Sequence, residues 1–474
     1  MHRADAVISS QSKRPFAPVI SILQTPYGLG LRIPNERPKT FEASLTAYCS
    51  PTPALFCTDQ RLSDFHTILH RRHCCTSVAI PWQNSKLTED GEMIPAAAVV
   101  EQSQNIQQGD GTMKSINYLL LSVLVTSSTV FPAEPWGLER GTPELQSAGT
   151  LAFGPDDVLF VGDTKSAAVF AIATGDTEGD SSNADININF LRAALSDVCD
   201  ADVTINDLAA NPRTGTVFIS LTAGDTPAIC RVDETERITR VSLEDVPFAS
   251  VSLPDAPEDK VTKRGRRRRN PRQDAITDIA FYEDRILVSG LRSGKSPSSV
   301  REFSFPFSSI DKGTGIAIYH AAHGRAEDYS AARTFVTLMI DGEPNLLAAY
   351  VCTPLVKIPL NELRTEGDRI QATTVAELGN RNRPLDMISY TKDGADYLLL
   401  SNDRRGVMKI TTSGLNENSG LSEPVRGGGL AGQTYETIES LNGVVQMDKL
   451  NDEYAIMLLV AENDDVSLKT VPLP

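Results

Sequence analysis

Three aspartates, Asp207, Asp278 and Asp386, occupy equivalent places in separate sequence repeats, each at the start of an apolar run. In the other repeats the equivalent places hold hydroxyl or amide side chains: Thr150, Thr334 and Asn442. If the repeats surround one axis, these side chains form a ring of oxygen atoms. Neighbouring carboxylates repel one another unless a cation or ordered water compensates, and oxygen ligands suit Ca²⁺ and Mg²⁺. The sequence therefore predicts a Ca²⁺ or Mg²⁺ site made by Asp207, Asp278, Asp386 and Asn442.

A structural role is the alternative for the same side chains. Asp, Asn and Thr often form hydrogen bonds with nearby backbone groups. Each side chain would then cap the start of one strand and bind backbone N–H groups of the neighbouring repeat. The sequence leaves both interpretations open.

Six copies of a three-stranded unit carry these residues. The clearest copy is 384–410, in which turn signals at Lys392-Asp393-Gly394 and 402–406 separate three apolar runs. The copies cover 149–172, 206–232, 278–303, 334–358, 384–410 and 442–471. One unit is too small to bury both faces of its sheet, so the copies must stack on one another. Six units spaced by about 40 to 60 residues are typical of an all-β, six-bladed β-propeller.

The connections complete this prediction. The last copy provides only three strands, and a closed ring avoids exposed strand edges. We expect its fourth strand to come from about 144–148, so that the beginning and the end of the propeller pair, or to be absent. Between the first two copies, 190–198 has the apolar spacing of a short helix.

Residues 1–112 differ from everything that follows. They lack the repeat and contain four of the seven cysteines. We expect them to be disordered, or to be upstream sequence included ahead of a true start at Met113. Histidines and cysteines gather in one part of this segment: Cys57, His66, His70, His73, Cys74 and Cys75. Without a paired C-x-x-C or a surrounding core, this cluster does not favour a zinc site.

Residues 113–133 have the plan of a secretory signal peptide. Met113 and Lys114 precede the apolar run 118–125, and small residues follow it. This run is too short to span a bilayer stably, and no other stretch reaches the roughly 20 apolar residues that a membrane span needs. We therefore expect an exported protein, periplasmic or secreted. It would start between Thr129 and Glu134, and the propeller would occupy 134–474.

The charge distribution limits the partners. A net charge of −16 argues against nucleic-acid binding through a general electrostatic surface. One basic run, 263–269, interrupts the acidic sequence. Such a run suits a polyanion or an acidic polysaccharide, and a solvated loop is the commoner outcome.

The remaining histidines and cysteines give weak signals. His320 and His323 are spaced so that both could bind one ion, but we identify no carboxylate or cysteine that completes the set, so we interpret them as a loop pair. Cys199 and Cys230 are close enough in sequence to suggest a disulfide, and burial as free thiols is equally consistent. Cys352 has no evident partner.

Two stretches, LAFGPDDVLFVGD at 151–163 and MISYTKDGADYLLLSNDRRGVMKI at 387–410, resemble the blades of the NHL, YncE and gluconolactonase (senescence-marker-protein) superfamily. The resemblance implies a six-bladed propeller, and its gluconolactonase-like members bind a divalent cation in the central channel. Those enzymes use a first-blade glutamate, asparagines and an aspartate. Here Thr150 and Thr277-Asp278-Ile279-Ala280 stand in the corresponding places.

The sequence thus favours a non-catalytic propeller that binds a small molecule or a protein on a loop-rich face, as a monomer without a transmembrane helix. The rival hypothesis is a divalent-metal-dependent lactonase or esterase. In that case a cation in the channel would polarise a carbonyl, and Asp278 or Asp386 would act as the base.

Overall fold

The computed structural model describes residues 21–25, 28–32, 135–264, 267–308, 310, 312–364 and 369–474. The chain divides into two units, Met1–Leu120 and Leu121–Pro474. In the first unit, β1 (Ser21–Thr25) and β2 (Gly28–Arg32) pair as an antiparallel hairpin. The signal peptide and the cluster between Cys57 and Cys75 lie outside the described residues, so the predictions for them remain predictions.

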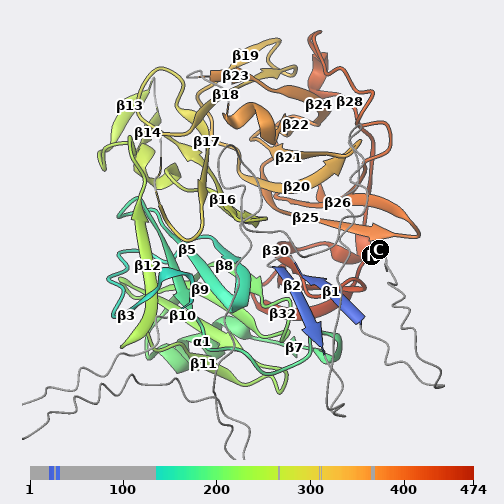
Figure 1. The fold of residues 1–474 in the computed structure, drawn as a ribbon. Helices are drawn as coiled ribbons and strands as arrows, with labels where there is room; N and C mark the ends of the chain where they lie inside the picture. The colour runs from blue at the N-terminus through green and yellow to red at the C-terminus, as the bar shows by residue number, and fades with distance from the viewer. Residues whose placement is uncertain are drawn as a thin grey trace, which may run out of the picture. The chain divides into compact units, whose positions relative to one another are not determined.

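Six mainly antiparallel sheets surround a common centre in the second unit, as the six-bladed prediction required (Figure 1). We number the blades by the chain order of their innermost strands. Blade 1 contains β4 (Leu151–Phe153), β5 (Val158–Asp163), β6 (Ala168–Ala173), β12 (Val246–Ser252) and β3 (Glu139–Gly141). Blade 2 contains β8 (Val203–Ala210), β9 (Val217–Ala223), β10 (Thr226–Val232) and β11 (Ile238–Arg240). Blade 3 contains β15 (Asp278–Tyr282), β16 (Arg285–Leu291), β17 (Ser298–Ser304), β18 (Thr314–His320) and β19 (Arg325–Glu327), with β23 (Arg369–Gln371) parallel to β18.

The other three blades have the same plan. Blade 4 contains β20 (Thr334–Ile340), β21 (Glu343–Ala349), β22 (Pro354–Pro359), β24 (Thr373–Leu378) and β28 (Leu430–Gly432). Blade 5 contains β25 (Pro384–Lys392), β26 (Ala395–Asn402), β27 (Gly406–Thr411) and β29 (Tyr435–Thr437). Blade 6 contains β30 (Val444–Lys449), β31 (Tyr454–Val460), β32 (Val466–Pro472) and β7 (Asn187–Ile188). The first three strands of every blade fall in the six predicted repeats.

The blades do not follow one another around the ring in chain order. The innermost strand of blade 1 contacts those of blades 2 and 3, and the innermost strand of blade 2 contacts that of blade 6. The ring therefore reads 3, 4, 5, 6, 2, 1. A sequential propeller would read 3, 4, 5, 6, 1, 2, so blades 1 and 2 have exchanged places.

The hydrophobic core confirms this order. Each of the six buried clusters combines side chains from two blades that are neighbours in the ring. Phe160 of blade 1 packs against Phe281 of blade 3 with ring centroids 5.7 Å apart. Leu208 of blade 2 shares a cluster with Ile456 of blade 6. Burial of apolar side chains between sheets is the main force that holds such a ring together.

Two strand exchanges close the ring. β7 precedes blade 2 in the chain but pairs with β32 as the outer strand of blade 6, and β12 follows blade 2 but pairs with β6 of blade 1. The expected pairing of early and late chain is confirmed, whereas the expected segment, 144–148, is wrong. The exchanged blade order brings β7 beside blade 6, and the carboxylate of Asp163 instead holds 144–148 by accepting hydrogen bonds from Gln146 N (2.7 Å) and Ser147 Oγ (2.6 Å).

The predicted helix is present as α1 (Leu191–Cys199). It buries Leu191, Leu195 and Cys199 in the cluster between blades 2 and 6, so it covers the junction of these two blades. Within the described part of the chain, the structure contains no helix that is both long and apolar enough to cross a membrane.

Candidate functional site

The innermost strands carry a ring of polar side chains in which aspartates alternate with neutral residues. In the spatial order of the blades, the ring reads Asp278, Thr334, Asp386, Gln446, Asp207 and Thr150. The alternation is not visible in the sequence, where Asp207 and Asp278 belong to consecutive repeats. The exchange of blades 1 and 2 thus separates like charges and gives the ring an approximate threefold pattern.

Each ring aspartate links its own strand to the next blade by a hydrogen bond. One oxygen of each carboxylate accepts a hydrogen bond from a backbone N–H across the blade boundary. The pairs are Asp278 with Phe335 at 2.7 Å, Asp386 with Met447 at 2.6 Å and Asp207 with Leu151 at 2.8 Å. The other oxygen of Asp278 and of Asp386 accepts from the N–H of the residue that follows it, at 2.8 and 2.7 Å. These are the contacts expected from the structural alternative.

β-bulges aim the ring side chains. The strand register shifts just before the ring position in three blades, between Ile205 and Asp207, between Pro384 and Asp386, and between Val444 and Gln446. A bulge bends its strand and redirects the side chain that follows. The periodicity of the repeats places these residues near the axis, and the bulges set the direction of their side chains.

The sixth ring residue is Gln446 rather than the predicted Asn442. Asn442 is exposed and ends a short 3₁₀ turn, because Gly443, with φ +90°, separates it from β30. With its amide nitrogen turned toward the carboxylates, Gln446 donates to Oδ1 of Asp207 (3.1 Å) and to Oδ2 of Asp386 (2.9 Å). This amide bridges two carboxylates of the ring. Gln446 therefore takes the place that was predicted for Asn442.

Burial and mutual repulsion raise the proton affinity of the ring carboxylates. Burial raises the pKa of Asp278 to about 6, against hydrogen bonds that lower it. Burial and the negative charge of Asp278 raise the pKa of Asp207 to about 7, despite hydrogen bonds from Leu151 and Leu208. Burial, followed by the charges of Asp207 and Asp278, raises the pKa of Asp386 well above its usual value. The Gln446 amide reaches both Asp207 and Asp386, and Thr150 Oγ1 donates to Asp278 Oδ1 (3.4 Å), so contacts within one ring connect the three carboxylates.

Asp448 links two blades in the same way, but this role was not predicted from the sequence. Its carboxylate accepts hydrogen bonds from Ala210 N of blade 2 (2.8 Å) and from Lys449 N (2.7 Å). Burial raises its pKa to about 6. Asp448 lies two residues after Gln446 in β30, and the alignment of this repeat on Asn442 left both residues out of the predicted ring.

The ring has one evident chemical capacity, which is to hold protons or a cation among convergent carboxylates. The oxygens that bind backbone N–H groups retain lone pairs, since each carboxylate can accept about four hydrogen bonds. Their present partners are backbone donors, and the arrangement therefore joins blades whether or not an ion binds. The Ca²⁺ or Mg²⁺ hypothesis remains a prediction for Asp207, Asp278 and Asp386.

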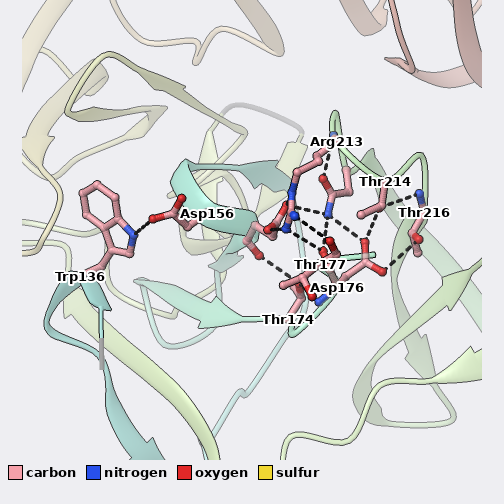
Figure 2. A network of polar contacts seen from close by, with 10 residues as sticks. Trp136, Asp156, Thr174, Asp176, Thr177, Arg213, Thr214 and Thr216 are labelled. Carbon is pink, nitrogen blue, oxygen red and sulfur yellow. Dashed lines mark hydrogen bonds and ion pairs between the residues drawn. The ribbon is translucent and has the colours of Figure 1, made fainter. Parts of the chain in front are cut away.

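A second polar network joins blades 1 and 2 at the first turn of each blade (Figure 2). Asp157, which is buried, accepts from Arg213 Nε (3.0 Å) and Asn211 Nδ2 (3.1 Å) and pairs with Arg213 Nη2. Asp176, also buried, accepts from Thr214 Oγ1, Thr216 Oγ1 and Asn211 Nδ2 at 2.5 to 3.1 Å. Every donor of this network has an acceptor, so it is a structural connection.

Arginines gather where the innermost strands of blades 3 to 5 begin. Arg333 directly precedes β20, Arg383 directly precedes β25, and Asp274 lies in the 3₁₀ turn Pro271–Asp274 ahead of β15. Asp274 pairs with Arg333 (3.0 Å) and with Arg269 (2.6 Å) from the basic run. Burial lowers the pKa of Arg333, and the nearby charge of Arg383 lowers it further. Two guanidinium groups thus share one carboxylate, and a third, that of Arg383, lies near Arg333.

The histidine pair is not the isolated loop pair that the sequence suggested. A carboxylate, that of Glu327, lies between His320 and His323, and the sulfur of Cys352 lies within 4.8 Å of a ring nitrogen of each. The sequence interpretation failed because Cys352 comes from blade 4, whereas His320 ends β18 of blade 3 and His323 lies in the turn that follows it. The Sγ atoms of Cys199 and Cys230 are 3.8 Å apart, and all three described cysteines are free thiols.

No family model matches the chain, and no curated protein sequence does. Similar solved structures include a chain of the "Crystal Structure of Mitotic Checkpoint Complex", with 9% identity, covering 76% of this chain and 99% of that chain at a TM-score of 0.32. A PQQ-bound aldose sugar dehydrogenase from Streptomyces coelicolor shares 11% identity over 70% of this chain and 97% of that chain, with a TM-score of 0.27. A putative oxidoreductase (glucose dehydrogenase) from Thermus thermophilus shares 13% identity over 70% of this chain and 99% of that chain, with a TM-score of 0.28. Likeness at this level carries no argument about function, and membership of the NHL, YncE and gluconolactonase superfamily remains a prediction.

Proposed function

We propose that the protein is an exported, monomeric, non-catalytic β-propeller that binds an anionic ligand on the face where its innermost strands begin. The observation that carries this proposal is that Arg269 and Arg333 share the carboxylate of Asp274, while Arg383 adds a further positive charge near Arg333. The chain has a net charge of −16, so a local excess of positive charge needs a specific explanation.

The arginines have different exposures that suit a binding site. The side chain of Arg333 is 20% exposed, and its Nε is buried without a hydrogen-bond partner. The side chain of Arg269 is 64% exposed, and Arg383 is also exposed. Guanidinium groups bind carboxylates and phosphates through paired hydrogen bonds, and buried Arg333 would give the site a fixed orientation.

Acidic polysaccharides are the ligand class that we favour. The basic run that contains Arg269 extends the positive charge along the chain, and Lys263, Arg268 and Arg269 are exposed. A row of cations suits a polymer with regularly spaced carboxylates better than one small anion. The rival hydrolase would need the ring carboxylates for catalysis, and their bonding to backbone N–H groups supports the non-catalytic proposal.

The test is the affinity of the full chain for polygalacturonate, with inorganic phosphate as a second probe, at low and at physiological salt. Replacing Arg383 and Arg269 together by glutamine should weaken binding by about tenfold or more, since each charged hydrogen bond contributes about 1.5–3 kcal/mol. Arg237, exposed in the turn between β10 and β11 at the other end of blade 2, provides the control Arg237→Gln. An equal loss in both variants, or no binding by the parent protein, would reject this proposal.

A further inference from the structure

His320, His323 and Cys352 form a compact group of nitrogen and sulfur atoms between blades 3 and 4. His320 is the last residue of β18, and His323 lies in the turn that follows it. Cys352 lies in the turn between β21 and β22. One ring nitrogen of each histidine and the sulfur lie within 4.8 Å of one another, and the two imidazole centroids are 3.8 Å apart.

Glu327 determines which imidazole nitrogens are available. Its Oε2 lies 2.9 Å from Nδ1 of His320, and its Oε1 lies 2.9 Å from Nδ1 of His323. A carboxylate accepts hydrogen bonds and does not donate them, so both Nδ1 atoms carry the hydrogen. The lone pair of each neutral imidazole is then on Nε2. A carboxylate that orients a histidine in this way is the usual outer partner of a metal-binding histidine.

One of these lone pairs lacks any partner. His320 is 3% exposed, and its Nε2 is buried without a hydrogen bond. A buried polar atom left unpaired is costly, and its presence in a native structure requires an explanation. A bound ion would supply the missing partner.

The backbone fixes the sulfur beside this nitrogen. Cys352 and Thr353 both have left-handed φ angles, +70° and +62°. Hydrogen bonds hold this conformation, from Cys352 N to the Asn382 carbonyl (2.8 Å) and from Thr353 Oγ1 to the Gly379 carbonyl (2.6 Å). The turn is therefore rigid, and Cys352 remains partly accessible.

We propose that His320, His323 and Cys352 bind a thiophilic divalent transition ion of the Zn²⁺ or Cu²⁺ class, with Glu327 as the positioning residue of both histidines. Two imidazoles and one thiolate suit such ions, and three protein ligands leave a fourth place for water or an external ligand. The carboxylate of Glu377, which is also buried, accepts a hydrogen bond from Ala322 N (3.1 Å). A second acidic side chain therefore lies beside the turn that carries His323. A cysteine–histidine nucleophile is the competing interpretation, but it requires only one histidine.

The test begins with the full chain in which alanine replaces the other candidate ligands: Cys57, His66, His70, His73, Cys74 and Cys75. This background should bind one equivalent of Co²⁺ with a thiolate-to-metal charge-transfer band, and Zn²⁺ should displace it. Cys352→Ser should remove the band, and His323→Ala should weaken Zn²⁺ binding by about tenfold or more. Glu327→Gln should weaken it by roughly 10–100-fold while the band persists at saturation.

The control is Cys199→Ser, a buried thiol in another part of the ring, which should leave the band unchanged. Far-ultraviolet circular dichroism in chelator would show that each variant is folded. Alkylation of Cys352 by iodoacetamide gives an independent measurement, because bound Zn²⁺ should protect this thiol. A folded background that binds no Co²⁺ or Zn²⁺, or unchanged binding in Cys352→Ser, would overturn the proposal; rapid alkylation unaffected by Zn²⁺ would favour the nucleophile.

Discussion

Replacing Asp278 by asparagine should change the sign of its effect on stability between acidic and alkaline pH. The pKa of this buried carboxyl is raised from 3.8 to about 6. The folded state therefore binds a proton more tightly than the unfolded chain. This stabilisation is complete below the unfolded pKa and is lost as pH rises through the folded pKa. The parent protein should lose about 3 kcal/mol of unfolding free energy from this group between about pH 4 and pH 7.

Asparagine has no proton to lose, so it should not show this pH dependence. Its amide retains one oxygen and turns a donor toward either Phe335 N or Ile279 N, which removes one of the two hydrogen bonds. That loss costs about 1 kcal/mol. At about pH 3 the variant should therefore be less stable than the parent by about 1 kcal/mol, and at about pH 8 it should be more stable by about 2 kcal/mol.

Urea unfolding in chelator, followed at several pH values, measures this difference. Asp245→Asn is the matched control, because the side chain of Asp245 is 79% exposed on blade 1. A difference between parent and Asp278→Asn that stays constant with pH would refute the reasoning. Adding Ca²⁺ tests the metal hypothesis in the same assay. If the ring binds Ca²⁺, the ion should stabilise the parent more at pH 8 than at pH 5 and have less effect on the variant.

Three further outcomes are expected. Asp176→Ala should lower the unfolding free energy by roughly 2 kcal/mol, because two buried hydroxyl donors lose their acceptor while Asn211 still donates to Asp157; a loss below about 0.5 kcal/mol in urea unfolding would contradict the structural role of that network. In the native, metal-free protein, iodoacetamide should label Cys352 and spare Cys230, whose pKa burial raises to about 12; peptide mapping that found equal labelling would show that this part of the core is open. N-terminal sequencing of exported protein should find a start between residues 129 and 134, and a mature protein that began at Met1 would exclude both the signal peptide and the start at Met113.

The repeats allowed the fold to be predicted because each blade is a local structure. Apolar runs separated by turns such as Lys392-Asp393-Gly394 determine a three-stranded sheet without knowledge of its neighbours. The order of blades around the ring depends on contacts between distant segments, such as Asn187–Ile188 with β32. No local pattern encodes such pairings, and the exchange of blades 1 and 2 was therefore not foreseen.

The candidate site, too, was predicted only where local sequence patterns determine it. Asp207, Asp278 and Asp386 were predicted to converge, because each precedes an apolar strand in the same phase. Gln446 was missed, since Gly443 and the bulge at Val444 shift blade 6 relative to the other repeats.

The histidine cluster needed information from two blades. Glu327 follows His320 by seven residues, but Cys352 belongs to the next repeat along the chain. Only the closure of blade 4 against blade 3 brings the sulfur to the imidazoles.

The exchanged blade order also has a consequence for biosynthesis. When the strands of blade 1 leave the ribosome, the edge of β6 has no partner until Val246–Ser252 has been made. The β7 segment remains unpaired for far longer, because Ile186 and the Thr470 side chain that accepts its hydrogen bond are 284 residues apart. Unpaired edges invite association between nascent chains, and closure of such distant segments slows folding. Nearly the whole chain must be complete before both edges are paired, so productive folding should depend on keeping the early strands apart from other chains until translation ends.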